Sequence, residues 1–231
     1  MKKSYWHQKT VVNTFTNDRP SVALSRFLNK LSNHKLITIL DLGCGGGRNT
    51  EMIFKKGFQI YACDNSTAMV KQTIKRMGKF IPGNIVGSYI KKATMIKLPY
   101  KSNFFDVVVS NGVFHNATSM NMLKKTIEET CRVLKNKGKL YLNIFYEFRN
   151  TTGVQKTKSP QVFLTSSELK MTLLSRRNIL HLFKEVDFKL CSNTRVYKKE
   201  LNVGVRGVFR AVFVKQKSIT RKITSGVTTS H

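Results

Sequence analysis

An acidic residue ahead of alternating glycines is the feature of this sequence best suited to chemistry. The acid is Asp41, and the glycines that follow it at alternating positions are Gly43, Gly45 and Gly47. Residues 36–42 form an apolar run with β-branched residues, which is typical of a buried parallel strand, and a helical pattern begins near Arg48. A strand, a glycine turn and a helix let a nucleotide-like ligand approach bare backbone at the N-terminus of the helix.

The turn does not match the phosphate-binding fingerprint of dinucleotide folds. That fingerprint needs glycines at its first, third and sixth positions. Counted from Gly43 the sixth position is Arg48, and counted from Gly45 it is Thr50. Asp41 would also bring a carboxylate close to a pyrophosphate, and like charges repel. The acid favours a cationic ligand, while a tight turn without a ligand is the structural alternative.

The acid and the alternating glycines resemble the first motif of the class I S-adenosylmethionine-dependent methyltransferases, of the type 11 or UbiE-like kind. The resemblance covers residues 36 to about 215. It implies S-adenosylmethionine as cofactor and transfer of its methyl group to a nucleophile. It also implies that the cofactor is bound by the residues of the motif, which are Asp41, Gly43, Cys44, Gly45 and Gly47.

A second acid stands where a ribose could be bound. Asp64 follows the predicted strand 59–63 and lies 21 residues after the first glycine of the motif. Dinucleotide folds place a ribose-binding acid at a comparable spacing, about 20 residues. The alternative role of Asp64 is to cap the next helix, which Ser66 could also do. The segment resembles the second motif of the family, in which Asn65 and Met69 line the adenosine pocket.

The segment before Leu98-Pro99-Tyr100 resembles the adenine-binding segment of the family. The family usually has an aspartate four residues before this leucine, and this chain has Thr94 there. A hydroxyl accepts a hydrogen bond more weakly than a carboxylate, so we expect a loosened adenine pocket. Met95 is expected to offer its backbone N–H.

Polar residues end the predicted strand 105–111, and the ligand crevice of an open parallel sheet lies outside such strand ends. Asn111 and Gly112 are therefore expected near the reactive end of the cofactor. His115 is a candidate catalytic base for a nucleophile that must lose a proton, and the alternative is a packing or hydrogen-bonding role.

The end of the predicted strand 105–111 lacks the Asn/Asp-Pro-Pro-aromatic motif of enzymes that methylate base amino groups. No cysteine follows a proline, so the nucleophile of cytosine-carbon methyltransferases is absent from the sequence.

The whole pattern predicts an α/β domain with a Rossmann-like, seven-stranded, mostly parallel sheet, an antiparallel C-terminal hairpin and helices on both faces. The methyltransferase domain is expected at residues 21–215. Residues 1–20 are an N-terminal arm that is either a lid over the cofactor or loosely packed. Residues 216–231 are expected to be a disordered, basic tail rich in serine and threonine.

Periodicity and turn residues give the individual elements. We expect strands at 36–42, 59–63, 85–90, 105–111, 139–145, 188–192 and 208–214. We expect helices at 20–31, 51–56, 66–79, 119–134, 167–174 and 175–184. Residues 135–138 are predicted to be a turn, and 146–165 an irregular insertion that either shapes substrate specificity or is a plain surface loop.

The charge balance leaves the methyl acceptor open between a small metabolite and RNA. The chain has 41 Lys and Arg against 12 Asp and Glu, which gives a formal net charge of +29. Such a field attracts nucleic acid, acidic membrane surfaces or phosphorylated molecules, although compositional drift is the alternative. If the acceptor is RNA, the expected phosphate contacts are Lys91, Lys92, Arg149, Lys156 and Lys158.

Cysteine spacing and hydropathy bear on environment. The four cysteines stand far apart without metal-ligand or disulfide spacing, so we expect no metal and reduced thiols in a cytoplasmic protein. The polar residues 4–13 lack the apolar core of a signal peptide, and no apolar run approaches membrane-spanning length.

The predicted activity is methyl transfer from the sulfonium to an O or N nucleophile. The alternative is an inactive, methyltransferase-like protein that binds the cofactor or RNA.

Overall fold

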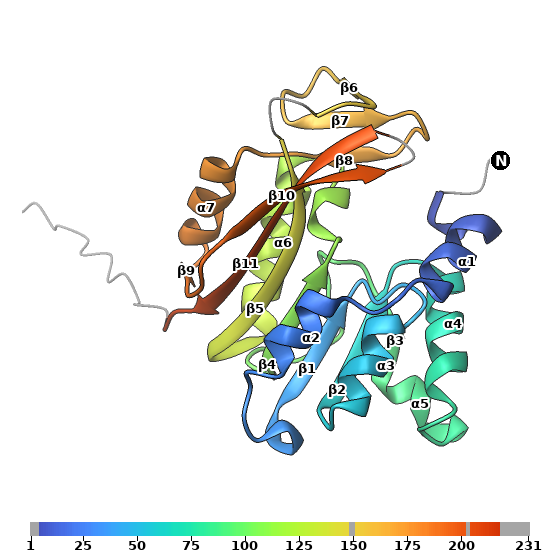
Figure 1. Cartoon of the computed structure of the whole chain (residues 1–231). Coiled ribbons are helices and arrows are strands. Elements are labelled where there is room, and N and C mark those ends of the chain that lie inside the picture. Colours follow the sequence, from blue (N-terminus) through green and yellow to red (C-terminus); the bar gives the residue numbers. More distant parts are fainter. Residues whose placement is uncertain (1–4, 148–150, 202–203, 218–231) are drawn as a thin grey trace, which may run out of the picture.

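A twisted central sheet carries the fold in the computed structural model, which describes residues 5–147, 151–201 and 204–217 (Figure 1). Its strand order is β10-β11-β5-β4-β1-β2-β3, and β9 also pairs with β11. The five parallel strands are β1 (Thr38–Leu42), β2 (Gln59–Asp64), β3 (Ile90–Lys92), β4 (Phe105–Asn111) and β5 (Leu134–Tyr146). Their carboxyl ends therefore meet at one edge of the sheet.

The antiparallel part of the sheet is built on β11 (Gly204–Lys215), which pairs with β5. The strand expected at 188–192 is β9 (Phe188–Leu190), whereas β10 (Arg195–Leu201), which forms the hairpin with β11, was not predicted, because almost all its residues are exposed and no apolar pattern marks it. The predicted mostly parallel sheet with a C-terminal hairpin is confirmed, with β10 as an eighth strand beyond the seven expected.

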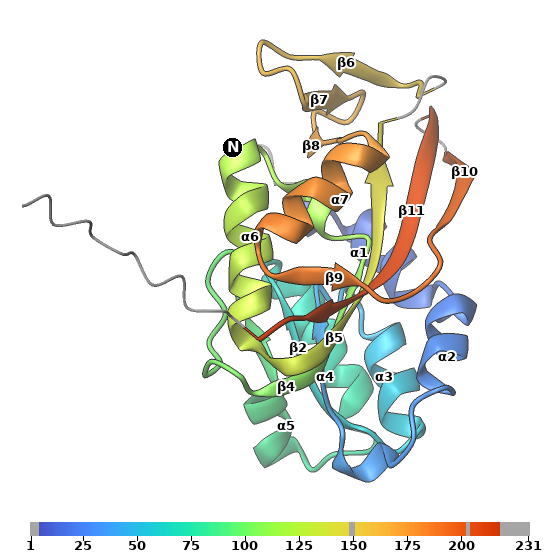
Figure 2. The ribbon, with the colours of Figure 1, turned by 90° about the vertical axis from the view of Figure 1, so that its left-hand side faces the viewer.

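Helices cover both faces of the sheet, as predicted. One face packs against α2 (Val22–Leu28), α3 (Arg48–Lys55), α4 (Thr67–Met77) and α5 (Gly83–Tyr89). The other face packs against α6 (Met120–Val133) and α7 (Arg176–Glu185). Figure 2 shows α6 and α7 on the opposite side of the sheet from α2 and α3.

The strand expected at 85–90 is wrong. These residues mostly belong to α5, and the third strand, β3, is shifted to 90–92. The β-branched Ile85 and Val86 suggested a strand, but Val86 is buried and Ile85 is exposed, and Pro82 directly precedes the helix. Tertiary packing of Val86 against the sheet outweighs the local β preference.

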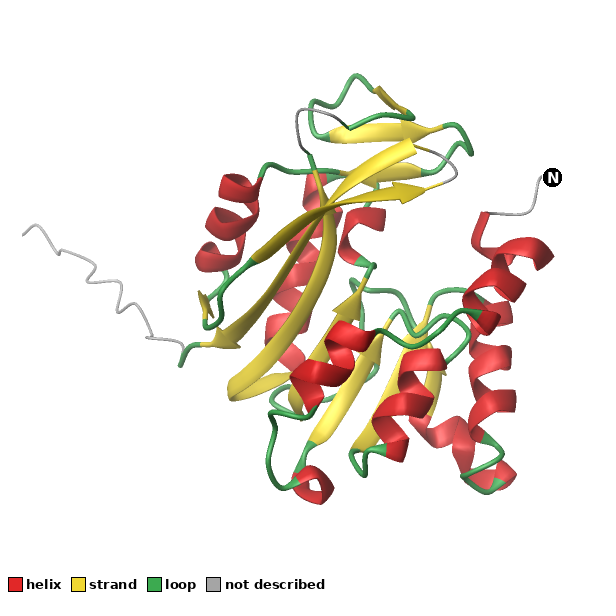
Figure 3. Cartoon of the chain, in the orientation of Figure 1, coloured by secondary structure: helices red, strands yellow, loops and turns green. Residues whose placement is uncertain are grey.

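The insertion after β5 forms a second, small sheet, coloured yellow at the top of Figure 3. Its strands are β6 (Val154–Lys156), β7 (Val162–Thr165) and β8 (Lys170–Thr172), so the irregular loop at 146–165 and the helix at 167–174 were wrong predictions. Phe163 pairs across strands with Met171, and both are buried with Leu173 in a core of their own. This short alternation of buried side chains stabilises strands rather than a helix.

The predicted turn at 135–138 lies inside β5. The strand passes through it as an irregularity, with Lys137 at a φ of 64° and a register shift between Phe105 and Val107 of β4. Three short 3₁₀ turns complete the described elements: η1 (Tyr5–His7), η2 (His34–Leu36) and η3 (Phe114–Asn116). The N-terminal helix is α1 (Lys9–Asn17), whereas the tail predicted at 216–231 lies outside the described residues from 218 onward.

Candidate functional site

The glycine turn between β1 and α3 is held in a conformation that side chains disfavour. Gly43, Gly45 and Gly47 have φ values of 71°, 57° and 81°. The N–H groups of Gly43 and Cys44 both donate to the carbonyl of Cys63, at 2.8 and 3.0 Å. A Cβ atom on Gly43 would lie 3.1 Å from Cγ1 of Val113. Val113 thus fills the space at Gly43, whereas a Cβ atom on Gly45 would meet only Cβ of Phe15 at 3.9 Å, so the open backbone beside the carboxyl ends of β1 and β2 is that of Gly45.

Asp41 is an almost fully buried acid at the base of this turn. Its Oδ2 accepts a hydrogen bond of 2.7 Å from the Thr50 hydroxyl. Burial is the main reason that the pKa of Asp41 rises from 3.8 to about 6, and the nearby Asp64 raises it further. A cation bound close to Asp41 would offset this desolvation, so the site chemically suits a positively charged ligand.

Asp64 lies at the carboxyl end of β2 and faces the glycine turn. Its Oδ2 accepts from the Gly45 N–H at 3.0 Å, and its Oδ1 accepts from the Ser66 N–H at 2.8 Å. The side chain of Ser66 caps α4 by accepting from the Met69 N–H. Capping is thus the role of Ser66. Each carboxylate oxygen of Asp64 keeps a second lone pair that can accept from a ribose hydroxyl.

The remaining residues of the first two motifs lie around this centre in different ways. The Cys44 thiol is buried with its Sγ 3.5 Å from the Thr73 hydroxyl, so only backbone of Cys44 faces the turn, and burial raises its pKa well above the ordinary value. Asn65 is exposed. Met69 is buried against Val11 and Val12 of the N-terminal segment.

The N-terminal segment, residues 5–17, packs on the glycine turn and on α4. The backbone carbonyl of Trp6 accepts a hydrogen bond of 3.0 Å from the Ser66 hydroxyl. Arg76 of α4 donates to the Thr16 carbonyl and, at 2.8 Å, to the Gly46 carbonyl. A Cβ atom on Gly46 would lie 2.5 Å from Cα of Thr16. Sequence reasoning missed Gly46 and Arg76, although an additional glycine within the motif was a usable signal.

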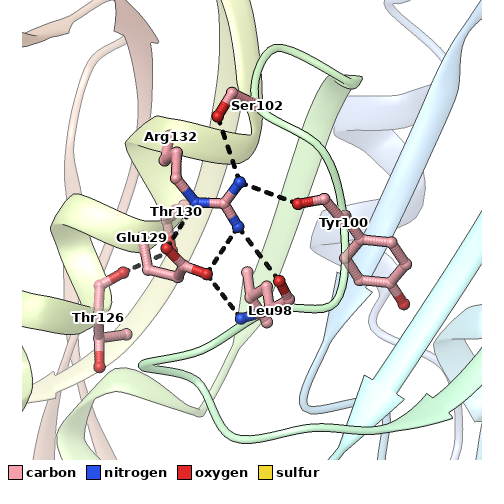
Figure 4. A network of polar contacts seen from close by, with 7 residues as sticks. All are labelled: Leu98, Tyr100, Ser102, Thr126, Glu129, Thr130 and Arg132. Atoms are coloured by element: carbon pink, nitrogen blue, oxygen red, sulfur yellow. Dashed lines mark hydrogen bonds and ion pairs between the residues drawn. The ribbon is translucent and has the colours of Figure 1, made fainter.

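The segment with Thr94 and Met95 is fixed to the helix layer by an ion pair on α6 (Figure 4). Glu129 accepts from the Leu98 N–H at 2.6 Å, and Arg132 donates to the carbonyls of Leu98 and Tyr100. The segment also joins the second strand, because the Ala93 N–H donates to the Asp64 carbonyl at 3.0 Å. Within this segment the Thr94 residue is exposed and Met95 is buried.

At the end of β4, two neighbouring strands are joined by asparagine contacts. The Gly112 N–H donates to the Asn143 carbonyl at 2.8 Å, and Nδ2 of Asn143 donates to Oδ1 of Asn111 at 3.0 Å. Asn143 lies on β5 and was not predicted from the sequence, because a single polar residue in an apolar strand carries no spacing signal. Both side chains are half-buried.

His115 is buried in η3, below this end of β4. Its Nδ1 accepts from the Phe145 N–H at 3.1 Å, and its ring stacks on that of Phe145 with centroids 4.2 Å apart. Burial, and secondarily the charge of Arg206, lowers the pKa of His115 to about 3. The neutral ring then carries its proton on Nε2 and has no free lone pair. This geometry favours the packing and hydrogen-bonding alternative over a catalytic base.

The small sheet contacts η3, which follows the carboxyl end of β4. Thr172 of β8 donates to the Ala117 carbonyl, directly after η3, at 2.7 Å. Of the lysines and arginine expected to contact phosphates, Lys156 and Lys158 are exposed on or beside β6, and Arg149 lies outside the described residues. Lys91 and Lys92 belong to β3, which is separated from β4 by β1 and β2.

Two absences hold for residues 5–147, 151–201 and 204–217. These ranges contain no helix with the length and apolar character needed to cross a bilayer. Within the same ranges, no three histidine, cysteine, aspartate or glutamate residues gather where a metal ion could be bound.

Comparison with known proteins agrees with this geometry. A family model described as a methyltransferase domain matches residues 40–142. An uncharacterized protein of Methanocaldococcus jannaschii is 31% identical over 202 residues, which cover 77% of this chain and 80% of that protein. A tRNA (carboxymethyluridine(34)-5-O)-methyltransferase of Arabidopsis thaliana is 27% identical over 170 residues; the match covers 69% of this chain but only 37% of that protein's length.

Solved structures share the fold at low identity. A SAM-dependent methyltransferase structure from Methanosarcina mazei superposes with a TM-score of 0.66 at 16% identity, covering 87% of this chain and all of that one. The chain belongs to the S-adenosylmethionine-dependent methyltransferase family, whose cofactor is S-adenosylmethionine. The residues present fit that cofactor, because the bare glycine turn, the buried Asp41 and the free lone pairs of Asp64 suit a cationic nucleoside.

Proposed function

We propose that this chain transfers the methyl group of S-adenosylmethionine to an oxygen or nitrogen nucleophile. The observation that carries the proposal is the convergence of Asp41, the glycine turn and Asp64 at the carboxyl ends of β1 and β2. When bound, the cofactor supplies a methyl group on a sulfonium, which is already an activated leaving group. The protein then has mainly to position the two reactants.

In this proposal each part of the crevice has a separate task. Asp64 accepts from the ribose hydroxyls, and the glycine turn lets the cofactor lie against backbone. The buried carboxylate of Asp41 favours the cationic end, directly or through its neighbours. Cys44, Asn65 and Met69, with Thr94 and Met95, surround the adenosine, while Asn111 and Gly112 lie at the methyl end. The N-terminal segment 5–17 serves as a lid, supported by its contacts with Gly46 and Ser66.

The acceptor is proposed to be RNA rather than a small metabolite. The net charge of +29 supports RNA, and the Arabidopsis relative is named as a tRNA methyltransferase. An inactive protein that only binds ligand is the second possibility, which turnover measurements separate from the first.

Calorimetric titration with S-adenosylmethionine tests the cofactor site. Asp64→Ala should weaken binding by about 1–3 kcal/mol, because it removes hydrogen bonds to a charged group. Glu128→Gln, an exposed acid on α6, is the matched control and should bind like the wild type. Equal affinity of Asp64→Ala and wild type would refute the assignment. Transfer of labelled methyl to bulk tRNA, rRNA or a metabolite extract then tests activity.

A further inference from the structure

Four polar residues form a continuous row across four adjacent strands. Arg195 of β10 pairs with Arg210 of β11, Arg210 pairs with Asn143 of β5, and Asn143 pairs with Asn111 of β4. Directly paired residues lie on the same face of a sheet. We name Arg195, Arg210, Asn143 and Asn111 the polar row; it leads from the outer strand β10 to the methyl end of the crevice.

The polar row lies on the face of the sheet that packs against α2. Tyr141 stands two residues before Asn143 on β5 and therefore shares its face. Its ring packs against Phe27 of α2, with centroids 5.2 Å apart. Beyond this contact the row becomes progressively open: Asn143 and Arg210 are half-buried, and Arg195 is exposed. The outermost strand at this end of the strand order is β10 (Figure 1).

A tyrosine joins the arginines at the outer end of the polar row. Tyr197, on the same face of β10 as Arg195, is 40% exposed. Nη2 of Arg210 donates to its hydroxyl at 2.6 Å, and the Arg210 guanidinium lies 5.1 Å from the centre of its ring. An exposed aromatic ring held beside a guanidinium group can stack on a base while the cation contacts phosphate.

The inner part of the polar row has hydrogen-bonding capacity that the protein does not use. Nε of Arg210 and Oδ1 of Asn143 are shielded from solvent, and neither has a hydrogen-bond partner in the described structure. Buried polar atoms are normally paired, and a buried atom without a partner costs about 1–3 kcal/mol. A ligand that brings both an acceptor and a donor would relieve this cost.

Within the described residues, three cations of the outer strand have no ion-pair partner. Arg195, Lys198 and Lys199 of β10 form no ion pair with a described residue. Most of the scarce acids are engaged elsewhere, in the crevice or in ion pairs: Asp18, Asp41, Glu51, Asp64, Asp106, Glu129 and Glu185. An anion is therefore the complementary ligand for this edge.

We propose that the polar row, with Tyr197, binds a nucleotide of single-stranded RNA and delivers its base to the methyl end of the crevice. Arg195 and Arg210 contact phosphate, Tyr197 stacks on a neighbouring base, and the amides of Asn143 and Asn111 bind the edge of the base that receives the methyl group. This inference rests on the proposed methyl transfer, since the row ends at that site.

Binding of labelled single-stranded RNA by the full chain across a salt series tests the row. The slope of log affinity against log salt is about −0.7 per phosphate contact. Arg195→Gln with Arg210→Gln should therefore flatten the slope by about 1.4 and weaken binding at least tenfold near physiological salt. Tyr197→Leu should weaken binding about tenfold with little change in slope, because a base stack carries no charge.

The matched control is Lys124→Gln with Lys125→Gln, which removes two exposed charges from α6 on the opposite face. This control should keep the wild-type slope within about 0.3, well below the change that two lost phosphate contacts produce. An equal flattening in the control, or no flattening in the row variant, would overturn the proposal. Methylation of free nucleoside monophosphates without methylation of RNA would overturn it as well.

Calorimetry with S-adenosylmethionine on the same samples separates this inference from the proposed function. Row variants that bind cofactor like the wild type are folded, so their RNA results count. A wild-type chain that binds no cofactor refutes the proposed function itself. A chain that binds cofactor, but whose RNA affinity ignores the row, refutes only the polar row.

Discussion

The two ends of the proposed ligand site are built differently. Around β1 and β2 the contacts depend on backbone: three glycines have positive φ, and Asp64 is fixed by two N–H donors. Around β4, β5 and β11 they depend on side chains, with Asn111, Asn143 and Arg210 aligned across strands. We refer to these as the cofactor half and the acceptor half.

Backbone contacts and side-chain contacts give two kinds of ligand specificity. A ligand bound through backbone geometry is insensitive to most side-chain changes but is excluded by a single added Cβ atom. A ligand bound through side chains can be exchanged by substitution, since no backbone rearrangement is needed. If the proposed assignment holds, the cofactor half suits a constant ligand, and the acceptor half suits a ligand that substitutions can exchange. Substitutions in each half should affect separate measurements.

Gly45→Val should give the largest effect, a complete loss of cofactor binding in calorimetry. Gly45 has a φ of 57°, which disfavours a β-branched residue, and the branch would occupy the space from which a ligand approaches backbone. Gly87→Val in α5 is the control, because a Cβ atom there meets nothing within 4 Å. Cofactor affinity that survives Gly45→Val would break the comparison between the halves.

Asp41→Asn should stabilise the protein near neutral pH while weakening cofactor binding. The folded state holds the Asp41 proton more tightly than the unfolded chain, so stability falls as pH rises from about 4 to about 6. With a pKa of about 6 in place of 3.8, that loss is about 3 kcal/mol. Denaturant unfolding at pH 4 and pH 7 measures it.

The asparagine variant should lack this part of the pH dependence. Asp106→Asn should change stability in the opposite direction. It breaks the ion pair of 2.8 Å with Lys135 and should therefore destabilise the protein. Identical pH dependence in wild type and Asp41→Asn would show that the burial of Asp41 has no such energetic cost.

His115→Phe should cost stability and leave chemistry almost unchanged. The Phe145 N–H loses its acceptor, which costs about 1–3 kcal/mol in unfolding free energy. Since the pKa of His115 is about 3, its ring does not titrate between pH 5 and 8. Turnover per folded molecule should keep its pH profile there. A fall in turnover of about 10²-fold or more would instead indicate that His115 acts as a catalytic base.

Thr94→Asp should give the smallest effect, a gain in cofactor affinity of less than tenfold. A carboxylate accepts a hydrogen bond from an amino group more strongly than a hydroxyl, and Thr94 is exposed at the proposed adenine end. Thr94→Val is the control and should bind slightly more weakly. Unchanged affinity in both variants would place the adenine elsewhere.

The sequence sufficed for β1, β2, β4 and β5 because each of these parallel strands contains a buried apolar run. It failed where short elements depend on distant contacts. The strand expected at 85–90 became α5 through the burial of Val86, and the expected loop and helix after β5 became a sheet whose core lies between Phe163 and Met171. Neither contact has a local signature.

The site shows the same division. The motif residues Asp41, Asp64 and the glycines are adjacent in sequence or at a recognisable spacing, so their convergence could be predicted. Asn143 and Arg210 reach the crevice only through strand register, which no local pattern encodes. The choice between the two roles of His115 could not be made from the sequence, because its burial and its hydrogen bond to Phe145 decide its protonation, and neither can be read from residue type.

The outer strand β10 carries a second consequence of the charge. Its residues are almost all exposed, and a seven-residue edge with open backbone groups is a template for pairing with another chain. Lys198, Lys199 and Glu200 place three consecutive charged side chains on that edge, which discourages such self-association. The excess of lysine thus protects the protein in concentrated solution, whatever ligand it attracts. Neutralising this edge should increase light scattering before it alters the fold.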